Sequence, residues 1–327
     1  MTLISEKHRL ELTTLRKDIK TDGRHAQIEY TDDWNEDSKR RDFTINAIYL
    51  DINGKIFDPQ DGVKDLKNNI VKFIGDPQKR IEEDYLRIIR FIRFSLEYSS
   101  VVEETSIEAI KLNLDGIKKL SKERILMELF KILKTKKCFE INNNNHLRSI
   151  FLLIFPELMY LNRLEKLTNN LFKKHLDVDT MLSVLLIDKN RNHEYFSHKY
   201  NISNNLRTKL DNISLNYEKI QSDKIFFSHD LKKNIYFLGK RKLILLNILS
   251  FSINKKVKIT DYLHILNNIK KAKIPNFPFD GNILKKQGIK EGVLIGKTLK
   301  LLENEWLNNN FKISEDKTKE IIKSQTI

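Results

Sequence analysis

The spacing of apolar residues changes near Asp76, and this change limits the folds that the chain can adopt. Before Asp76, LELTTLR (residues 10–16) alternates apolar and polar positions, and Asn53-Gly54 separates two short apolar runs, as in a β-hairpin. After Asp76, apolar residues recur three and four apart, as on amphipathic helices, in residues 80–98, 106–120 and 121–134. We therefore predict an α+β fold in which a small β-containing head precedes a long helical array.

Local signals add detail to this division. Residues 21–41 are polar and are predicted to form a loop between the two β segments. Ser121 is a favourable N-cap, so we expect a helix to begin there. Beyond Lys137 the pattern predicts short helices separated by polar segments.

Charge and cysteine content narrow the class of protein. The 59 lysines and arginines exceed the 44 acidic residues and give a formal charge of +15, which attracts phosphate backbones. A single cysteine, Cys138, excludes an internal disulfide framework and a cysteine-based zinc cluster, and we expect it to be buried. No apolar run is long enough for a membrane span, and the first residues do not resemble a signal peptide. A cytoplasmic protein with nucleic acid as its first candidate partner is predicted.

Arginines recur at every turn of one predicted helix, in the segment EEDYLRIIRFIRF (residues 82–94). Glu83, Arg87 and Arg90 would share a face, with Asp84 beside them and Arg93 one turn further. Neighbouring arginines repel one another unless carboxylates or a bound anion compensate, and guanidinium groups suit phosphates and base edges. Two readings stay open: a salt-bridged surface helix, or a helix that binds a nucleotide.

A carboxylate beside an arginine can also distinguish bases. Asp84 would accept a hydrogen bond from the exocyclic amino group of cytosine or adenine, while Arg87 donates to the adjacent ring nitrogen. Guanine and uracil present a carbonyl at that position, so this pair would reject them.

A second charged cluster stands in KRRDFTINAI (residues 39–48). Arg40, Arg41 and Asp42 are predicted at the mouth of a strand, where their side chains can project into a cleft. Asn46, in the middle of that strand, suggests a specific hydrogen bond because asparagine is disfavoured in strands. An ordinary charged strand entrance is the alternative.

Several segments match known motifs, namely RRDFTINAI (40–48), DPQDGVKDL (58–66), EEDYLRIIRFIRF (82–94), SKERILMEL (121–129) and FDGNILKKQGIKEGVLIGKTLKLLENEWL (279–307). In order and spacing they resemble the class II CCA-adding enzyme and bacterial poly(A) polymerase family. The resemblance implies addition of nucleotides from CTP and ATP to an RNA 3′ end without a nucleic-acid template, most often CCA on tRNA. It also implies four regions: a partial nucleotidyltransferase head (1–75), a helical neck that recognises nucleotides and binds RNA (76–137), a helical body (138–225) and an RNA-binding helical tail (226–327).

The resemblance assigns roles to individual residues. Arg41 and Asp42 would contact the ribose and phosphates of the incoming nucleotide. Asp84 and Arg87 would read the base, with Arg90 and Arg93 lining the nucleotide pocket. The neck motif is structural and comprises Ser121, Glu123 and Arg124.

Metal binding is the weakest part of the match. Phosphoryl transfer needs Mg²⁺ held by clustered carboxylates, and in this family two of them come from a D-x-D strand that does not precede LELTTLR here. Glu11 is therefore the one expected catalytic and metal-binding carboxylate, in an incomplete site. Asp177-Val178-Asp179 has the D-x-D form, but its surroundings favour a helix N-terminus.

Two explanations follow from the incomplete site: an active enzyme whose gene model is truncated at the N-terminus, or a relative that binds without catalysing. In either case we expect the chain as given to be inactive. Transfer of CMP and AMP to tRNA is the predicted activity of the complete enzyme. Poly(A) polymerase and a catalytically incomplete RNA-binding protein are the alternatives.

Basic residues of the C-terminal half are candidates for RNA contacts. Tyr236 and Phe237 stand among five of them: Lys232, Lys233, Lys240, Arg241 and Lys242. A solvated helical face is an equal alternative. Trp306 falls on an apolar helical stripe and is expected in the core. Beyond tRNA or another RNA 3′ end and the nucleotides CTP and ATP, neither a membrane nor a protein partner is indicated.

Overall fold

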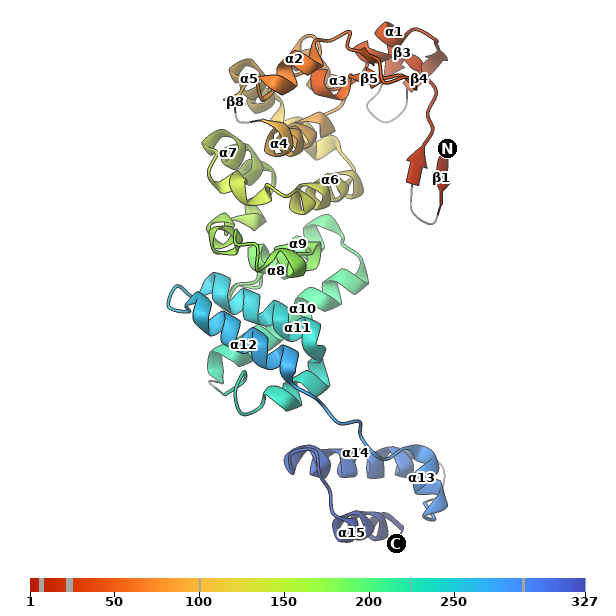
Figure 1. Cartoon of the computed structure of the whole chain (residues 1–327), viewed down its shortest axis with the longest axis vertical. Coiled ribbons are helices and arrows are strands. Elements are labelled where there is room, and N and C mark those ends of the chain that lie inside the picture. Colours follow the sequence, from red (N-terminus) through yellow and green to blue (C-terminus); the bar gives the residue numbers. More distant parts are fainter. Residues whose placement is uncertain (6–8, 22–25, 100, 224, 290–291, 327) are drawn as a thin grey trace. The chain divides into compact units, whose positions relative to one another are not determined.

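The computed structural model describes all residues except 6–8, 22–25, 100, 224, 290–291 and 327 (Figure 1). The chain divides into two compact units. Unit 1 comprises Met1–Tyr217 and Ile248–Lys256, and unit 2 comprises Glu218–Asn247 and Val257–Ile327.

Strands of the described chain occur in the first 102 residues and form four two-stranded pairs (Figure 1). The antiparallel pairs are β1 (Thr2–Ile4) with β2 (Arg9–Glu11), β3 (Arg16–Thr21) with β4 (Ala26–Tyr30), and β5 (Tyr49–Leu50) with β6 (Ile56–Phe57). The fourth pair is parallel and joins β7 (Ile70–Val71) to β8 (Val101–Val102). The α+β fold class is confirmed, but β8 corrects the expectation that residues 76–137 are entirely helical.

The expected hairpin at Asn53-Gly54 is present, with Tyr49 opposite Phe57 and Gly54 at a positive φ of 83°. LELTTLR is not one strand, because residues 12–15 connect β2 to β3. The predicted polar loop 21–41 was also wrong where the structure describes it. It contains all of β4 and the short helix α1 (Trp34–Lys39), whose N-cap Asp33 accepts a hydrogen bond from the Asn35 amide.

The segment RRDFTINAI forms a strand only at one residue. Phe43 makes an isolated bridge to Phe73, after which Thr44–Asn46 forms a 3-10 turn, η1. Phe43 is fully buried against the rings of Phe73, Phe91 and Phe94. The mid-strand position expected for Asn46 is therefore wrong, although its expected specific hydrogen bond exists: its amide donates to Asp42 Oδ1 at 2.8 Å.

The remaining helices that lie wholly in unit 1 begin with α2 (Gly62–Lys67), α3 (Pro77–Glu83) and α4 (Leu86–Tyr98). They continue with α5 (Glu104–Asn113), α6 (Lys122–Lys134), α7 (Asn145–Ile154), α8 (Val178–Leu186) and α9 (Asn192–Tyr200). Five 3-10 segments join some of them: Leu114–Lys119, Cys138–Asn142, Pro156–Leu158, Leu161–Leu167 and Lys173–His175. Ser121 caps α6 as expected, and Cys138 is buried as expected. Asp177 is the N-cap of α8, in agreement with the helix-terminus reading of Asp177-Val178-Asp179.

The predicted helix over 80–98 is interrupted. Asp84 is extended, with φ −156° and ψ 104°, so that α3 ends at Glu83 and α4 begins at Leu86. Asp84 Oδ1 accepts a hydrogen bond from the Leu86 amide, and such local side-chain bonds compete with helix continuation. The apolar face of α4 still packs as predicted, since Ile88, Ile89 and Ile92 are fully buried.

Helices α10 (Asn204–Ser222) and α11 (Leu231–Ile253) have residues in both units, and α11 is kinked at Gly239. Unit 2 also contains α12 (Ile259–Lys271), α13 (Gly281–Lys286), α14 (Val293–Asn308) and α15 (Glu315–Thr326). One of its buried clusters is formed by Leu284, Ile289, Leu302 and Ile322. Trp306 lies in a second cluster, with Leu307 and Phe311, as expected for a core residue.

Candidate nucleotide and RNA site

The arginines predicted to form the site are joined by carboxylates that the protein itself supplies. We use the name arginine cluster for Arg40, Arg41, Arg80, Arg87, Arg90, Arg93 and Arg124 together with their acidic partners Asp37, Asp42, Glu83, Asp84, Glu97 and Glu128. All of these residues belong to unit 1.

Asp37 of α1 binds the first two arginines. Its side chain is fully buried and forms ion pairs with Arg40 (2.5 Å) and Arg41 (3.0 Å). The Tyr49 hydroxyl donates to Asp37 Oδ2 at 2.7 Å. Burial raises the pKa of Asp37, but hydrogen bonds from Tyr49, Arg40 and the Arg16 amide outweigh it, so that the pKa falls to about 2.

Helices α3 and α4 hold the same segment by its backbone. Arg80 donates to the Arg41 carbonyl at 2.5 Å, and Arg87 donates to the Arg40 carbonyl at 3.5 Å. Glu83 Oε2 receives both Arg80 (2.5 Å) and Arg87 (2.6 Å). Hydrogen bonds thus join the Arg40–Arg41 segment, which would bind phosphates, to helices α3 and α4, next to the residues that would read the base.

Asp42 and Glu128 are the buried anions on the other side of α4. Arg90 Nε pairs with Asp42 Oδ2 at 2.6 Å, and Arg93 Nε pairs with Glu128 Oε2 at 3.0 Å. Burial raises the pKa of Asp42, but Arg90 and the bonds from Asn46 and the Phe43 amide lower it below its ordinary value. Burial likewise raises the pKa of Glu128, but Lys131, Arg93 and Arg90 lower it below its ordinary value, so both carboxylates stay ionised at neutral pH.

Asp84 and Arg87 have different partners. Asp84 Oδ2 pairs with Arg124 of α6 at 2.7 Å, whereas Arg87 pairs with Glu83. Tyr85, between them, packs closely against Gly116: its ring lies 2.0 Å from where a Cβ on residue 116 would stand, so a larger residue at that position would displace the ring. The neck residues Ser121 and Arg124 thus act in capping and in holding Asp84, while Glu123 is exposed.

The arginine cluster carries excess positive charge. Its seven arginines, with Lys131 on Glu128, meet six carboxylates through the ion pairs described and the Arg93–Glu97 pair. Counted over these residues alone, the positive charges exceed the negative ones by two, and planar guanidinium groups are well suited to phosphate. The salt bridges of the first reading from the sequence are present, and binding of a nucleotide by this face stays a prediction.

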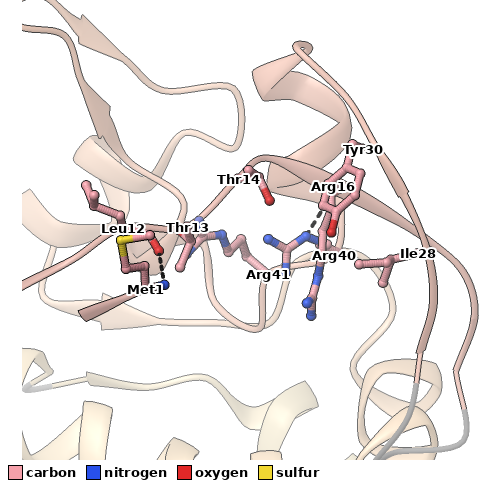
Figure 2. A pocket seen from close by; sticks show the side chains of 9 residues that line it. All are labelled: Met1, Leu12, Thr13, Thr14, Arg16, Ile28, Tyr30, Arg40 and Arg41. Carbon is pink, nitrogen blue, oxygen red and sulfur yellow. Dashed lines mark hydrogen bonds between the residues drawn. The ribbon is translucent and has the colours of Figure 1, made fainter. Parts of the chain in front are cut away.

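A pocket of about 640 Å³ opens beside Arg40 and Arg41 (Figure 2). Its other lining residues are Met1, Leu12, Thr13, Thr14, Arg16, Ile28 and Tyr30. Figure 2 shows the two guanidinium groups among these side chains, with Arg40 bonded to the Arg16 carbonyl at 2.9 Å. The pocket offers hydroxyl groups, an aromatic ring and cations, which are groups that a nucleotide can contact.

Glu11 lies at the end of β2 and is exposed. Within the described ranges, no group of three or more His, Cys, Asp or Glu side chains is placed to hold a metal ion. A two-metal transfer site needs several carboxylates, so the residues that the structure describes do not fit the magnesium site that the family implies.

Four members of the arginine cluster were missed by sequence reasoning, namely Asp37, Arg80, Glu97 and Glu128. Asp37 lies in the segment read as a polar loop, and Arg80 and Glu128 were read as ordinary helical residues. The spacing D-x-x-R-R-D from Asp37 to Asp42 was the available signal, since it places Asp37 four residues before Arg41, the separation of an ion pair on a helix.

A second basic region lies in unit 2. Lys240 and Lys273 line a pocket of about 600 Å³ with Tyr236 and Phe277, and Lys240 donates to the Lys270 carbonyl at 2.8 Å. Tyr236 packs against Trp306 and donates to Glu303, which raises its pKa to about 12. Phe237 is 63% exposed, so it is the aromatic side chain available for stacking.

Comparisons with known proteins agree with these features. A family model described as the poly A polymerase head domain matches residues 1–72, and one described as the probable RNA and SrmB-binding site of polymerase A matches residues 101–161. The chain is 30% identical to the human mitochondrial CCA tRNA nucleotidyltransferase 1, over 96% of this chain and 72% of the relative. It is 29% identical to the CCA-adding enzyme of Lactobacillus helveticus, over 94% of this chain and 76% of the relative.

Solved structures show the same fold. The Bacillus stearothermophilus CCA-adding enzyme in complex with CTP aligns with a TM-score of 0.68 and 18% identity, over 94% of this chain and 77% of that one. The Thermotoga maritima CCA-adding enzyme complexed with tRNA aligns with a TM-score of 0.59 and 22% identity, over 89% and 74%. The sequence identity to the human relative, extending over nearly the whole chain, shows that this protein belongs to the CCA tRNA nucleotidyltransferase family.

Proposed function

We propose that this protein serves template-independent transfer of CMP and AMP from CTP and ATP to the 3′ end of tRNA. The observation that carries the proposal is the arginine cluster, in which Arg80 and Arg87 bond the backbone of Arg40 and Arg41. The names of the relatives, and the CTP and tRNA in the solved complexes, support the choice of substrates.

In this proposal Arg41 and Asp42 contact the nucleotide's phosphates and ribose, and Arg90 keeps Asp42 ionised and in place. Asp84 and Arg87 read the base, while Arg93 and Glu128 brace α4 against α6. Because Asp84 pairs with Arg124, a cytosine or adenine amino group would share or replace that partner. Glu83 would keep Arg87 oriented while its remaining donors face the base.

Magnesium would supply activation of the attacking 3′-oxygen and neutralise the leaving pyrophosphate. Glu11 is the one residue offered for it, and the described residues do not complete the site. We therefore assign residues 1–327 the binding of nucleotide and RNA, and we expect little transfer from them alone.

Unit 2 is the proposed RNA contact through Lys240 and Lys273, which line its pocket, with Phe237 exposed for stacking. Division into head, neck, body and tail at residues 75, 137 and 225 is part of the same proposal. We also propose a cytoplasmic location.

Among the described residues, no helix is long and apolar enough to cross a membrane.

Poly(A) polymerase is the second candidate, since the matched family models carry that name. The two activities differ in nucleotide use: CCA addition needs CTP as well as ATP, and poly(A) synthesis needs ATP only. Binding of CTP as tight as that of ATP would favour CCA addition.

The transfer assay uses tRNA lacking CCA with Mg²⁺, CTP and ATP, and compares residues 1–327 with the same residues fused to the D-x-D strand of a CCA-adding relative. We expect both proteins to retard the tRNA on a gel, and only the fused protein to extend it. Extension by residues 1–327 at the rate of the fused protein would contradict the assignment of an incomplete metal site. Absence of tRNA binding by both would contradict the proposed function.

A further inference from the structure

Asp37 accepts more hydrogen bonds than a single ion pair in the core would need. Its Oδ1 accepts from the Arg16 amide (3.2 Å) and from Arg40 Nε (3.0 Å), and its Oδ2 accepts from Arg41 Nε (3.1 Å) and the Tyr49 hydroxyl. One fully buried carboxylate thus fixes two successive guanidinium groups and ties α1 to β3 and β5.

These bonds set where the arginines point. A guanidinium has five N–H donors. Arg40 gives some of them to Asp37 Oδ1 and the Arg16 carbonyl, and Arg41 gives some to Asp37 Oδ2, so each bond set uses only part of the five. The remaining donors are those of side chains that line the 640 Å³ pocket. Arg80 and Arg87 hold the carbonyls of the same two residues, so both the backbone and the side chains of this segment are fixed.

We propose that Asp37 is a positioning residue for the triphosphate of the incoming nucleotide, acting through Arg40 and Arg41. The proposal rests on the proposed function, because it requires that the pocket binds a nucleoside triphosphate. It goes beyond that function in giving Asp37, which has no exposed surface for a ligand, control over phosphate binding.

Charge alone predicts the opposite effect. Removing a carboxylate from a cationic pocket raises its positive potential and strengthens phosphate binding. If Asp37 orients the two guanidinium groups, its loss frees both side chains, and binding must then order them again at an entropic cost. The direction of the change therefore separates the two roles.

The test measures equilibrium binding of CTP and CMP, in buffer with Mg²⁺, to the full chain and to Asp37→Asn. We expect CTP binding to weaken about tenfold or more, with a smaller change for CMP, which has fewer phosphates to hold. Asn has nearly the same shape as Asp, so the pocket is not enlarged. CTP binding that is unchanged or tighter, or an equal loss for CTP and CMP, would overturn the positioning role.

Two further variants keep the test decisive. Glu157→Gln is the matched control, because Glu157 is also a buried carboxylate with a lysine (Lys199, 2.5 Å) and a tyrosine (Tyr200) as partners, outside the arginine cluster. It should lower thermal stability and leave the CTP-to-CMP affinity ratio unchanged; a ratio reduced as much as in Asp37→Asn would overturn the proposal.

Should Asp37→Asn fail to fold, Tyr49→Phe replaces it, since this change removes one hydrogen bond to Asp37 and leaves the carboxylate in place. We expect the CTP-to-CMP affinity ratio to fall about twofold to threefold. An unchanged ratio would overturn the proposal. Failure of the unaltered chain to bind CTP would instead reject the proposed function itself.

Discussion

The two basic regions of this protein differ in how their charges are held. In unit 1 the arginines are half-buried and paired with carboxylates, such as Arg93 with Glu128 and Arg90 with Asp42. In unit 2 Lys240 and Lys273 are exposed, and the ammonium group of Lys240 donates a hydrogen bond to the backbone carbonyl of Lys270. Guanidinium groups that are half-buried and paired with carboxylates are held in fixed orientations. Exposed ammonium groups attract anions without a fixed orientation, and salt weakens that attraction. The basic residues behind the +15 charge are therefore held in two different ways.

The largest expected effect is on stability and comes from Glu128→Gln. This change removes the buried anion of Arg93 and the longer of the two ion pairs of Arg90 (3.7 Å), which keeps Asp42, and breaking a buried pair costs about 3–5 kcal/mol. The matched control is Lys118→Ala, which breaks the exposed Asp115–Lys118 pair and should change stability far less than Glu128→Gln does. Urea unfolding measures both. Equal losses would show that burial does not distinguish the two kinds of pair.

Base selection should depend on α4 and not on unit 2. Arg87→Ala removes the donor proposed to meet the base, and loss of such a contact costs about 1–3 kcal/mol of discrimination. Asp84→Ala should act in the same direction. Competition binding of CTP, ATP, UTP and GTP measures the preference. Unchanged preference in both variants would show that this charged face is purely structural.

Acid should weaken unit 1 through Asp37. Its pKa is depressed in the folded state, from 3.8 to about 2. A depressed carboxyl pKa stabilises the fold above the pKa of the unfolded chain, and this stability is lost as the pH falls through the folded pKa. Asp37 should thus contribute about 2 kcal/mol at neutral pH that disappears between about pH 5 and pH 2. Urea unfolding of the full chain and of Asp37→Asn over this range measures it: the gap between them should narrow as the pH falls. A gap that stays constant would contradict the assignment.

The smallest effect is expected in unit 2. Lys240→Gln with Lys273→Gln should weaken tRNA binding modestly and lower the slope of log K against log salt by about one for each lost phosphate contact. CTP binding should not change. Filter binding at several salt concentrations measures this. A changed preference among nucleotides, or an unchanged salt dependence of tRNA binding, would show that the two basic regions do not have the separate roles proposed.

Many of the helices could be predicted from the sequence, because helical periodicity and N-caps depend on residues that are close to one another in the chain. Ser121 capping α6, the buried face of α4 and the core position of Trp306 follow from spacing alone. The arginines of α4 were identified as a site because repeated cations on one face need an anion. Their partners were not, because Asp42 and Glu128 lie 48 and 35 residues from the arginines they bind.

The errors have local physical causes. Asp84 interrupts the predicted helix through its own side-chain bond to the Leu86 amide, in a stretch without glycine or proline. Phe43 pairs with Phe73 for one residue only, so a pattern that alternates like a strand forms a 3-10 turn instead. Residues 21–41 are wrongly predicted as a loop because the strand β4 has only five residues and the helix α1 has only six, three of them charged.

The most direct test of the central claim is equilibrium binding of the four nucleoside triphosphates to residues 1–327, because the claim is that Asp84, Arg87 and the arginine cluster form a nucleotide site that reads the base. Calorimetry or a fluorescent competitor in the presence of Mg²⁺ would measure it without requiring turnover. The account predicts that CTP and ATP bind with comparable affinity, and about fivefold or more tighter than UTP and GTP. Equal affinity for all four, or tighter binding of UTP and GTP, would contradict it.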